Sequence, residues 1–182
     1  MRGWNGINIE PLPTEYKELV KYRTRDINLQ IGISNKEGNT TLFMIGMGST
    51  LLKNYSSHNS PSINITVHSM QNVCNKYIPK NKIIDFCKID VEGEEKNVLL
   101  GYDFKNYRPK VFCIESTIPG TSIPCHNLWE DLLLKNNYSF AYQYDINRYY
   151  IDNNKIQLKQ RFNKADEIIK NYKKNPIINI FK

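Results

Sequence analysis

Two carboxylates, Asp90 and Glu92, stand two positions apart where an apolar segment meets a glycine. The segment is I-I-D-F-C-K-I-D-V-E-G at residues 83–93, and its first part has the composition of a β-strand. Side chains at this spacing point to one side of an extended chain. Ligands of open α/β sheets bind at the carboxyl ends of the strands, so the pair predicts a ligand site. The alternative is that both carboxylates only cap the helix that follows.

A helix is predicted directly after this pair. Gly93 permits a turn, residues 94–100 have helical composition with two acids at the start, and Gly101 is a typical C-terminal cap. Two other predicted strands also end in an acid, Glu10 and Glu115. Parallel strands would bring these acids to one edge of the sheet. Glu115 is then either a second acid behind the site or a solvated strand end.

Histidine and cysteine give weaker signals. His68 follows an alternating strand and could act as a general base, although a lone histidine is more often structural. Cys125 and His126 have no partner pair at metal-ligand spacing, so we assign no metal-binding residues. The four cysteines fit reduced, buried thiols, which predicts a cytoplasmic protein.

The order of the predicted elements indicates an α/β fold. Strands and helices alternate, which is typical of a mostly parallel sheet flanked by helices. Residues 27–34 alternate as one strand, and residues 138–144 and 148–152 read as a closing antiparallel pair. We assign residues 1–153 to one domain and residues 154–182 to a basic helical tail.

The positive charge of the chain is concentrated in this tail. Of the formal net charge of +7, the residues from Tyr150 onward carry +5, from eight Lys or Arg and three Asp or Glu. We interpret this charge as a solvated helix face and expect no nucleic-acid partner. A helix is predicted at residues 164–174, with four side chains turned inward: Ala165, Ile168, Ile169 and Tyr172.

Composition narrows the class of protein further. A chain of 182 residues with 40% hydrophobic and 24% charged residues fits one globular domain. No apolar run approaches the roughly 18 residues of a membrane span. The first six residues lack the apolar core of a secretion signal. We therefore expect no membrane span.

Five segments keep the order and spacing of a known family. They are G-W-N-G-I-N-I-E-P at 3–11, I-D-F-C-K-I-D-V-E-G-E-E at 84–95, V-L-L-G-Y-D-F at 98–104, R-P-K-V-F-C-I-E at 108–115 and N-R-Y-Y-I at 147–151. Together they resemble the FkbM family of S-adenosylmethionine-dependent methyltransferases over roughly residues 3–151. The I-D-V-E-G block is the most specific of the five.

The resemblance implies a Rossmann-like class I methyltransferase sheet with S-adenosylmethionine as the cofactor. By the same resemblance, Glu10 would accept hydrogen bonds from both ribose hydroxyls, because a carboxylate can bind a vicinal diol through its two oxygens. Pro11, Ile33 and Ser34 would border the adenine. The family usually methylates hydroxyl oxygens, so the expected acceptor is a saccharide or another small metabolite.

The resemblance also gives the two carboxylates a role. Asp90 and Glu92 would lie near the methyl donor. There one of them could orient or deprotonate the acceptor hydroxyl, or help to hold a cation that does so.

The family pattern contains one element that this sequence lacks. A strand and a Gly-rich turn of the D-V-G-A-N-x-G kind normally precede the G-W-x-G-I-N-I-E-P segment, whereas this chain begins at Met1. We therefore expect an amino-terminally truncated frame in which the first, central strand is missing between those carrying Glu10 and Asp90. The two halves would then either close on each other or leave a gap.

The missing turn normally holds the amino acid end of the cofactor. Cofactor binding by the chain is therefore expected to be weak or absent, and the enzyme could be inactive. The alternative function is a non-catalytic remnant or binding module that needs a partner.

Overall fold

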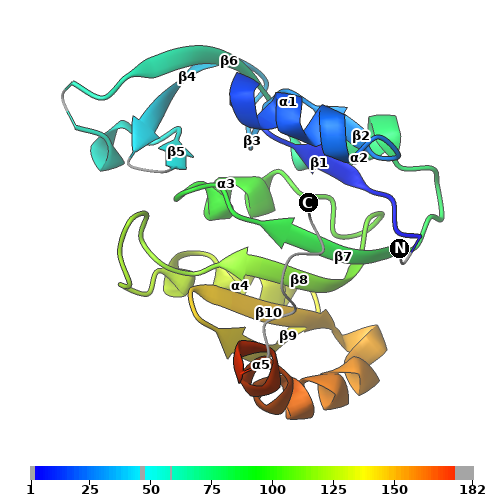
Figure 1. The fold of residues 1–182 in the computed structure, drawn as a ribbon. Coiled ribbons are helices and arrows are strands. Elements are labelled where there is room, and N and C mark those ends of the chain that lie inside the picture. Colours follow the sequence, from blue (N-terminus) through cyan, green and yellow to red (C-terminus); the bar gives the residue numbers. More distant parts are fainter. Residues whose placement is uncertain (1–2, 46–47, 58, 175–182) are drawn as a thin grey trace.

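The computed structural model describes residues 3–45, 48–57 and 59–174 (Figure 1). The strands are β1 (Ile7–Ile9), β2 (Ile27–Leu29), β3 (Gly32–Ser34), β4 (Gly38–Ile45), β5 (Gly48–Thr50), β6 (Ser62–Ser69), β7 (Ile84–Ile89), β8 (Pro109–Glu115), β9 (Tyr138–Tyr144) and β10 (Asn147–Asp152). The helices are α1 (Pro13–Tyr22), α2 (Met70–Tyr77), α3 (Glu95–Leu100), α4 (Glu130–Lys135) and α5 (Ala165–Lys174), with short 3₁₀ segments η1 (Lys53–Tyr55), η2 (His126–Leu128) and η3 (Asn153–Lys164). None of the described helices is long and apolar enough to cross a membrane.

A four-stranded sheet in the order β7-β8-β10-β9 carries the segment with Asp90 and Glu92 at the end of its first strand. Strands β7 and β8 are parallel and are connected through α3, whereas β10 is antiparallel to both of its neighbours. The predicted antiparallel pair at 138–144 and 148–152 is confirmed, with β10 one residue longer than expected. This sheet therefore places the ends of β7 and β8 next to each other.

A separate parallel pair, β1-β2, lies beside β7 and is connected through α1 (Figure 1). Among the residues that the structure describes, β1 pairs only with β2, and β7 only with β8. One backbone edge of each strand is thus without a ladder partner. Figure 1 shows β1, β7 and β8 running in the same direction across the view. The backbone ladder between the two sheets is therefore open, and no described strand lies between β1 and β7.

The third sheet has the order β3-β6-β4-β5, in which β4 and β6 form a long antiparallel pair. The prediction of one strand at residues 27–34 is wrong, because β2 and β3 pair in different sheets. Gly32 explains the second pairing. A Cβ on Gly32 would lie 2.8 Å from Ile65 Cδ1 and 2.9 Å from Val67 Cγ1, so any larger residue would require these two side chains of β6 to shift.

The prediction of a mostly parallel sheet also needs correction. The pairs β1-β2, β3-β6 and β7-β8 are parallel, whereas the pairings of β10 with β8 and β9, and of β4 with β5 and β6, are antiparallel. In the third sheet the chain reverses direction between β4 and β5, and β6 then runs antiparallel to β4 along the other edge of β4, so no long crossover makes these strands parallel. The fold is a mixed α/β structure with several sheets.

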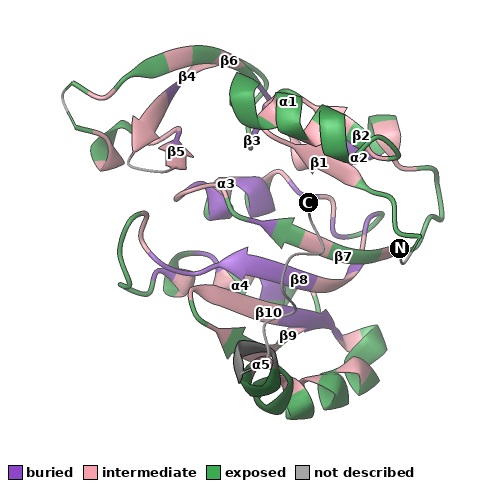
Figure 2. Cartoon of the chain, viewed as in Figure 1, coloured by how far each residue is buried: buried purple, intermediate pink, exposed green. Residues whose placement is uncertain are grey.

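One hydrophobic core joins the two sheets beside β7. Buried aromatic rings form its centre, with Phe112 of β8 5.4 Å from the Tyr102 ring and 5.1 Å from the Tyr138 ring between centroids. Ile7 and Ile9 of β1 pack against this core. Buried residues are concentrated on β8, β10 and α3 (Figure 2). Side chains thus connect β1 to the larger sheet although its backbone does not.

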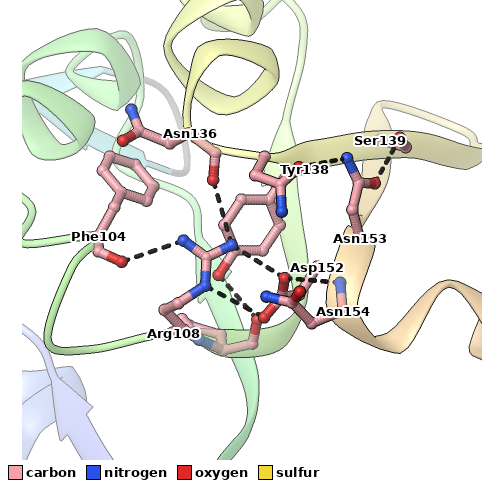
Figure 3. Close-up of polar contacts among 10 residues, drawn as sticks. Phe104, Arg108, Asn136, Tyr138, Ser139, Asp152, Asn153 and Asn154 are labelled. Carbon is pink, nitrogen blue, oxygen red and sulfur yellow. Dashed lines mark hydrogen bonds and ion pairs between the residues drawn. The ribbon is translucent and has the colours of Figure 1, made fainter.

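Arg108 fixes the start of β8 to the end of β10 (Figure 3). Its Nε and Nη2 donate to the two carboxylate oxygens of Asp152 at 3.2 and 2.9 Å, and further bonds reach the carbonyls of Phe104 and Asn136. Its guanidinium lies 4.8 Å from the Tyr138 ring centre. Burial alone would raise the pKa of Asp152, but the bonds from Arg108 hold that pKa below its usual value. This partly buried ion pair connects the start of β8 to the end of β10, so removing one partner would leave the other charge unpaired.

The tail forms η3 and then α5, so the predicted helix at 164–174 is confirmed to within one residue. Phe162 of η3 packs between Tyr142 and Tyr149, with ring centroids 5.7 and 5.5 Å away. The prediction that Ile168 turns inward is wrong, because this residue is 61% exposed. Ala165 and Ile169 are partly buried, whereas Ile168 lies on the exposed side of α5. The Tyr172 side chain lies outside the described residues.

Candidate functional site

Three carboxylates meet where β7 and β8 end. Asp90 directly follows β7, Glu92 lies in the next turn, and Glu115 is the last residue of β8. One oxygen from each lies within 4.8 Å of the others. The parallel pairing of the two strands, with Ile89 opposite Ile114, is what brings these ends together. The structure thus joins Glu115 to the predicted pair of Asp90 and Glu92.

The sequence around Glu92 holds this residue in an unusual conformation. Its φ of 51° lies in the left-handed region, which costs a non-glycine residue about 1 kcal/mol or more. Thr50 Oγ1 donates a 2.6 Å hydrogen bond to the Glu92 carbonyl. Gly48 gives its carboxylate room, since a Cβ there would lie 2.7 Å from Oε1. Strand β5 therefore positions Glu92 from a distant part of the chain.

Glu115 is the most constrained member of the group. The residue is 5% exposed, and its Oε2 is buried without a hydrogen-bond partner among the described residues. Burial, and then the nearby Asp90 carboxylate, raise the pKa of Glu115 to about 8. Burial and Asp90 also raise the pKa of Glu92 above its usual value. The group therefore favours a bound proton or another positive charge.

One lysine offsets part of this negative charge. Lys88 Nζ lies 2.7 Å from Asp90 Oδ2 and donates a 3.1 Å hydrogen bond to Asn147 Oδ1. Both partners of the Lys88–Asp90 pair are more than a third exposed, so water screens the interaction. Neither Glu92 nor Glu115 forms an ion pair with another of the described residues. Asp90 therefore occupies the wetter side of the group, and Glu115 the drier side.

The helix-cap interpretation of Asp90 and Glu92 does not describe this turn. Among the described residues neither side chain accepts a hydrogen bond from an amide of α3, and the turn itself is held by Glu95, whose Oε1 accepts hydrogen bonds from the amides of Val91 and Gly93 at 3.2 and 3.3 Å. Glu95 is 2% exposed, and burial raises its pKa. Since Glu95 satisfies the turn, Asp90 and Glu92 are left to face Glu115.

Glu10 and Pro11 follow β1, as predicted. Glu10 is half-buried, and its Oε1 accepts a 2.9 Å hydrogen bond from the Leu12 amide. Burial raises the pKa of Glu10, and this hydrogen bond opposes the shift. Its second oxygen accepts no hydrogen bond within the described part of the chain. One oxygen of Glu10 is thus engaged locally, and the other is available to a ligand.

Ile33 and Ser34 of β3 are both buried. Ile33 belongs to the hydrophobic core. Ser34 Oγ donates a 2.9 Å hydrogen bond to Glu94 Oε2, which ties β3 to the start of α3. A role for either residue beside an adenine ring stays a prediction.

His68 of β6 lies in a different hydrogen-bonded group. Its Nδ1 is 2.6 Å from Glu37 Oε2, and Glu37 Oε1 accepts bonds from the Ser69 amide and from Asn72. The Ser69 amide is the main cause of the lowered pKa of Glu37, with His68 adding to it. The structure does not bring His68 into the carboxylate group, and its role as a base stays a prediction.

Two surface hollows lie away from these residues. One is formed by β4 and β6 and lined by Asn39, Thr40, Thr41, Asn64, Ile65 and Thr66. The other includes residues from α3 to Asn106, together with Gln71, Leu132 and Asn136. Neither hollow contains an ionisable group of the predicted site, so we base the site on the carboxylates and not on these hollows.

A protein-family comparison decides what kind of domain carries these residues. The family model described as the methyltransferase FkbM domain matches residues 1–140, which is most of the chain. The chain belongs to the FkbM methyltransferase family. No curated protein and no solved structure matches it. In this FkbM domain the carboxylate group falls within the matched residues.

Sequence reasoning missed several residues of the FkbM domain's site. The contact of Gly48 and Thr50 with Glu92 joins segments more than forty positions apart, and the loop around Gly48 has no periodicity that would reveal it. The role of Glu95 was hidden because acids in a first helical turn are common. The position of Glu115 at a strand end was the one available signal for its place beside Asp90.

Proposed function

We propose that this FkbM domain is an S-adenosylmethionine-dependent methyltransferase that methylates a hydroxyl oxygen of a saccharide or another small metabolite. One observation carries the proposal within the family: Asp90, Glu92 and Glu115 meet at the carboxyl ends of two parallel strands. In α/β sheets this is the edge where ligands bind. Carboxylates there suit a reaction in which a hydroxyl must lose its proton.

The strand order supports a class I methyltransferase arrangement. In this proposal β2-β1 and β7-β8-β10-β9 are two parts of one Rossmann-like sheet, with one strand position between β1 and β7. The common direction of β1, β7 and β8 in Figure 1 and the core that they share support this interpretation. The carboxyl ends of all three strands would then border one cofactor site.

The residues fit part of the cofactor. Glu10 Oε1 is bonded to the Leu12 amide, which leaves the other oxygen for a hydrogen bond from a ribose hydroxyl rather than the two-oxygen contact implied by the family. Pro11, Ile33 and Ser34 are proposed to lie near the adenine. The described residues include no Gly-rich turn for the amino acid end. When bound, the cofactor supplies an electrophilic methyl group.

The carboxylates would act on the acceptor. Glu92 is a stronger base than an ordinary glutamate, because burial and Asp90 raise its pKa. Asp90 is exposed enough to accept a hydrogen bond from an acceptor hydroxyl while Lys88 neutralises its other side. In this proposal the pair orients the hydroxyl and removes its proton as the oxygen bonds to the methyl carbon. His68 is a weaker candidate, since Glu37 engages its ring.

The state of the four cysteine thiols supports a proposal for the cellular compartment. Cys74, Cys87, Cys113 and Cys125 are all free, which is typical of a reducing compartment. We therefore propose a cytoplasmic location for the domain.

Cofactor binding tests the proposal directly. Titration of the 182-residue chain with S-adenosylhomocysteine, followed by saturation-transfer NMR, should show contact with the ribose protons and an affinity weaker than micromolar. Glu10→Gln should weaken this contact, whereas Glu18→Gln, an exposed acid on α1, should leave it unchanged. Equal binding by the parent and Glu10→Gln would contradict the assigned ribose contact, and no contact at all would contradict the proposed cofactor.

A binding module is the second candidate function. The open edges of β1 and β7, and the exposed side chains of Ile83 and Phe86 at 65% and 42%, favour a partner that covers this part of the molecule. Exposed strand edges readily pair with another chain. Under this hypothesis Asp90→Ala and Glu92→Ala would change stability alone, and S-adenosylhomocysteine would not bind.

A further inference from the structure

The carboxylate group has more negative charge than its protein partners neutralise. Asp90, Glu92 and Glu115 each have an oxygen within 4.8 Å of the others, and of these three carboxylates Lys88 pairs with Asp90 alone in the described structure. Glu115 is only 5% exposed, its carboxyl group belongs to this cluster, and its Oε2 is buried without a hydrogen-bond partner in the described part of the chain. A buried carboxylate oxygen without a partner is costly, and such sites usually have a ligand that compensates.

We propose that Asp90, Glu92 and Glu115 bind one divalent metal cation of the class that prefers oxygen ligands. The ligand set contains carboxylate oxygens only, which favours Mg²⁺, Mn²⁺ or Ca²⁺ over softer metals. The site goes beyond the proposed methyl transfer and does not rest on it.

The spacing of the oxygens suits a shared ion. Ligands on opposite sides of Mg²⁺ are about 4 Å apart, and those of Ca²⁺ about 5 Å apart, from their usual bond lengths. The three carboxylates lie inside that range, so small side-chain rotations would bring them onto one ion. The ends of β7 and β8 fix two of them, and Thr50 with Gly48 fixes the third.

The neighbouring side chains leave the space between the three carboxylates open to a cation. Glu95 is turned toward the amides of Val91 and Gly93, so it adds negative charge without closing the group. Lys88 binds Asp90 from the exposed side and would compete with the cation for that carboxylate.

Mn²⁺ is a suitable probe because its free ion has an electron paramagnetic resonance signal that falls on binding. The 182-residue chain, freed of metals with EDTA and desalted, should bind one Mn²⁺, with Mg²⁺ or Ca²⁺ competing. Glu115→Gln and Glu92→Gln should each weaken binding about tenfold or more, whereas Glu18→Gln should not. Circular dichroism would establish that each variant is folded.

A fourth variant, Lys88→Met, should change the affinity for Mn²⁺ in the opposite direction. Lys88→Met removes the ammonium group that competes at Asp90, so it should tighten Mn²⁺ binding. Unchanged affinity in both Glu115→Gln and Glu92→Gln, or no Mn²⁺ binding by the folded parent chain, would overturn the proposal. Since no cofactor is added, neither result depends on whether S-adenosylhomocysteine binds.

Discussion

Replacing Glu115 with glutamine should stabilise the metal-free chain at alkaline pH, in contrast to most core substitutions. The carboxylate is buried, and its Oε2 has no hydrogen-bond partner in the described structure. Glu115→Gln keeps the shape of the side chain, removes its charge and adds an amide donor that can bond to Asp90. The variant therefore removes the unfavourable charge while leaving the packing of β8 intact.

The pKa of Glu115 gives the sign and the size of the effect. It is raised from 4.5 to about 8, so between these values the folded chain retains a proton that the unfolded chain has lost. The parent thus loses stability as pH rises from about 4.5 to about 8. One pKa unit corresponds to about 1.4 kcal/mol, which sets an upper bound of about 5 kcal/mol. Removing one unsatisfied buried polar group usually changes stability by less than this bound, so we expect about 1–3 kcal/mol.

Urea unfolding in EDTA, followed by circular dichroism from about pH 5 to about pH 8.5, measures this effect. The difference in unfolding free energy between Glu115→Gln and the parent should be small at the acidic end and grow toward the alkaline end. Glu18→Gln provides the exposed-acid control. A difference that does not change with pH, or a variant less stable than the parent at pH 8, would refute the reasoning.

Two other predictions test the parts of the fold that hold this site. In urea unfolding, Arg108→Ala should lower the unfolding free energy by about 3 kcal/mol, because it leaves the buried Asp152 carboxylate without its cation. Lys135→Ala, which breaks an exposed pair with Asp131, should cost less than about 0.5 kcal/mol in the same assay. Equal losses in the two variants would contradict the importance of burial. Backbone amides of β7 should exchange with deuterium faster than those of β8 when followed by NMR, because β8 has a hydrogen-bonded neighbour on both sides and β7 on one side only in the described structure. Equal protection of the two strands would mean that something covers the open edge of β7.

Local sequence patterns were sufficient for the strand, turn and helix around Asp90. The apolar run predicts β7, Gly93 predicts the turn, and the first acids of residues 94–100 predict α3. These features depend on neighbours within a few positions, so the sequence displays them directly. The antiparallel β9-β10 pair was predicted for the same reason, since a short turn connects its strands.

Contacts between distant segments were not predictable in this way. The break between β2 and β3 depends on where β6 packs, and Gly32 shows no local sign of that approach. The conformation of Glu92 depends on Thr50 and Gly48, which belong to another sheet. The exposure of Ile168 depends on which face of α5 meets the domain, and a helical period alone does not select between adjacent apolar positions.

Mapping S-adenosylhomocysteine onto the folded chain by amide NMR is the most direct measurement of the central claim, that the carboxyl ends of β1, β7 and β8 form the site of a methyltransferase. Assigned spectra of the ¹⁵N-labelled chain, recorded during the titration, should show the largest shifts at Glu10 and from Asp90 to Gly93, with Glu18 unaffected. Shifts confined to other parts of the molecule, or none at a saturating concentration of the nucleoside, would contradict it.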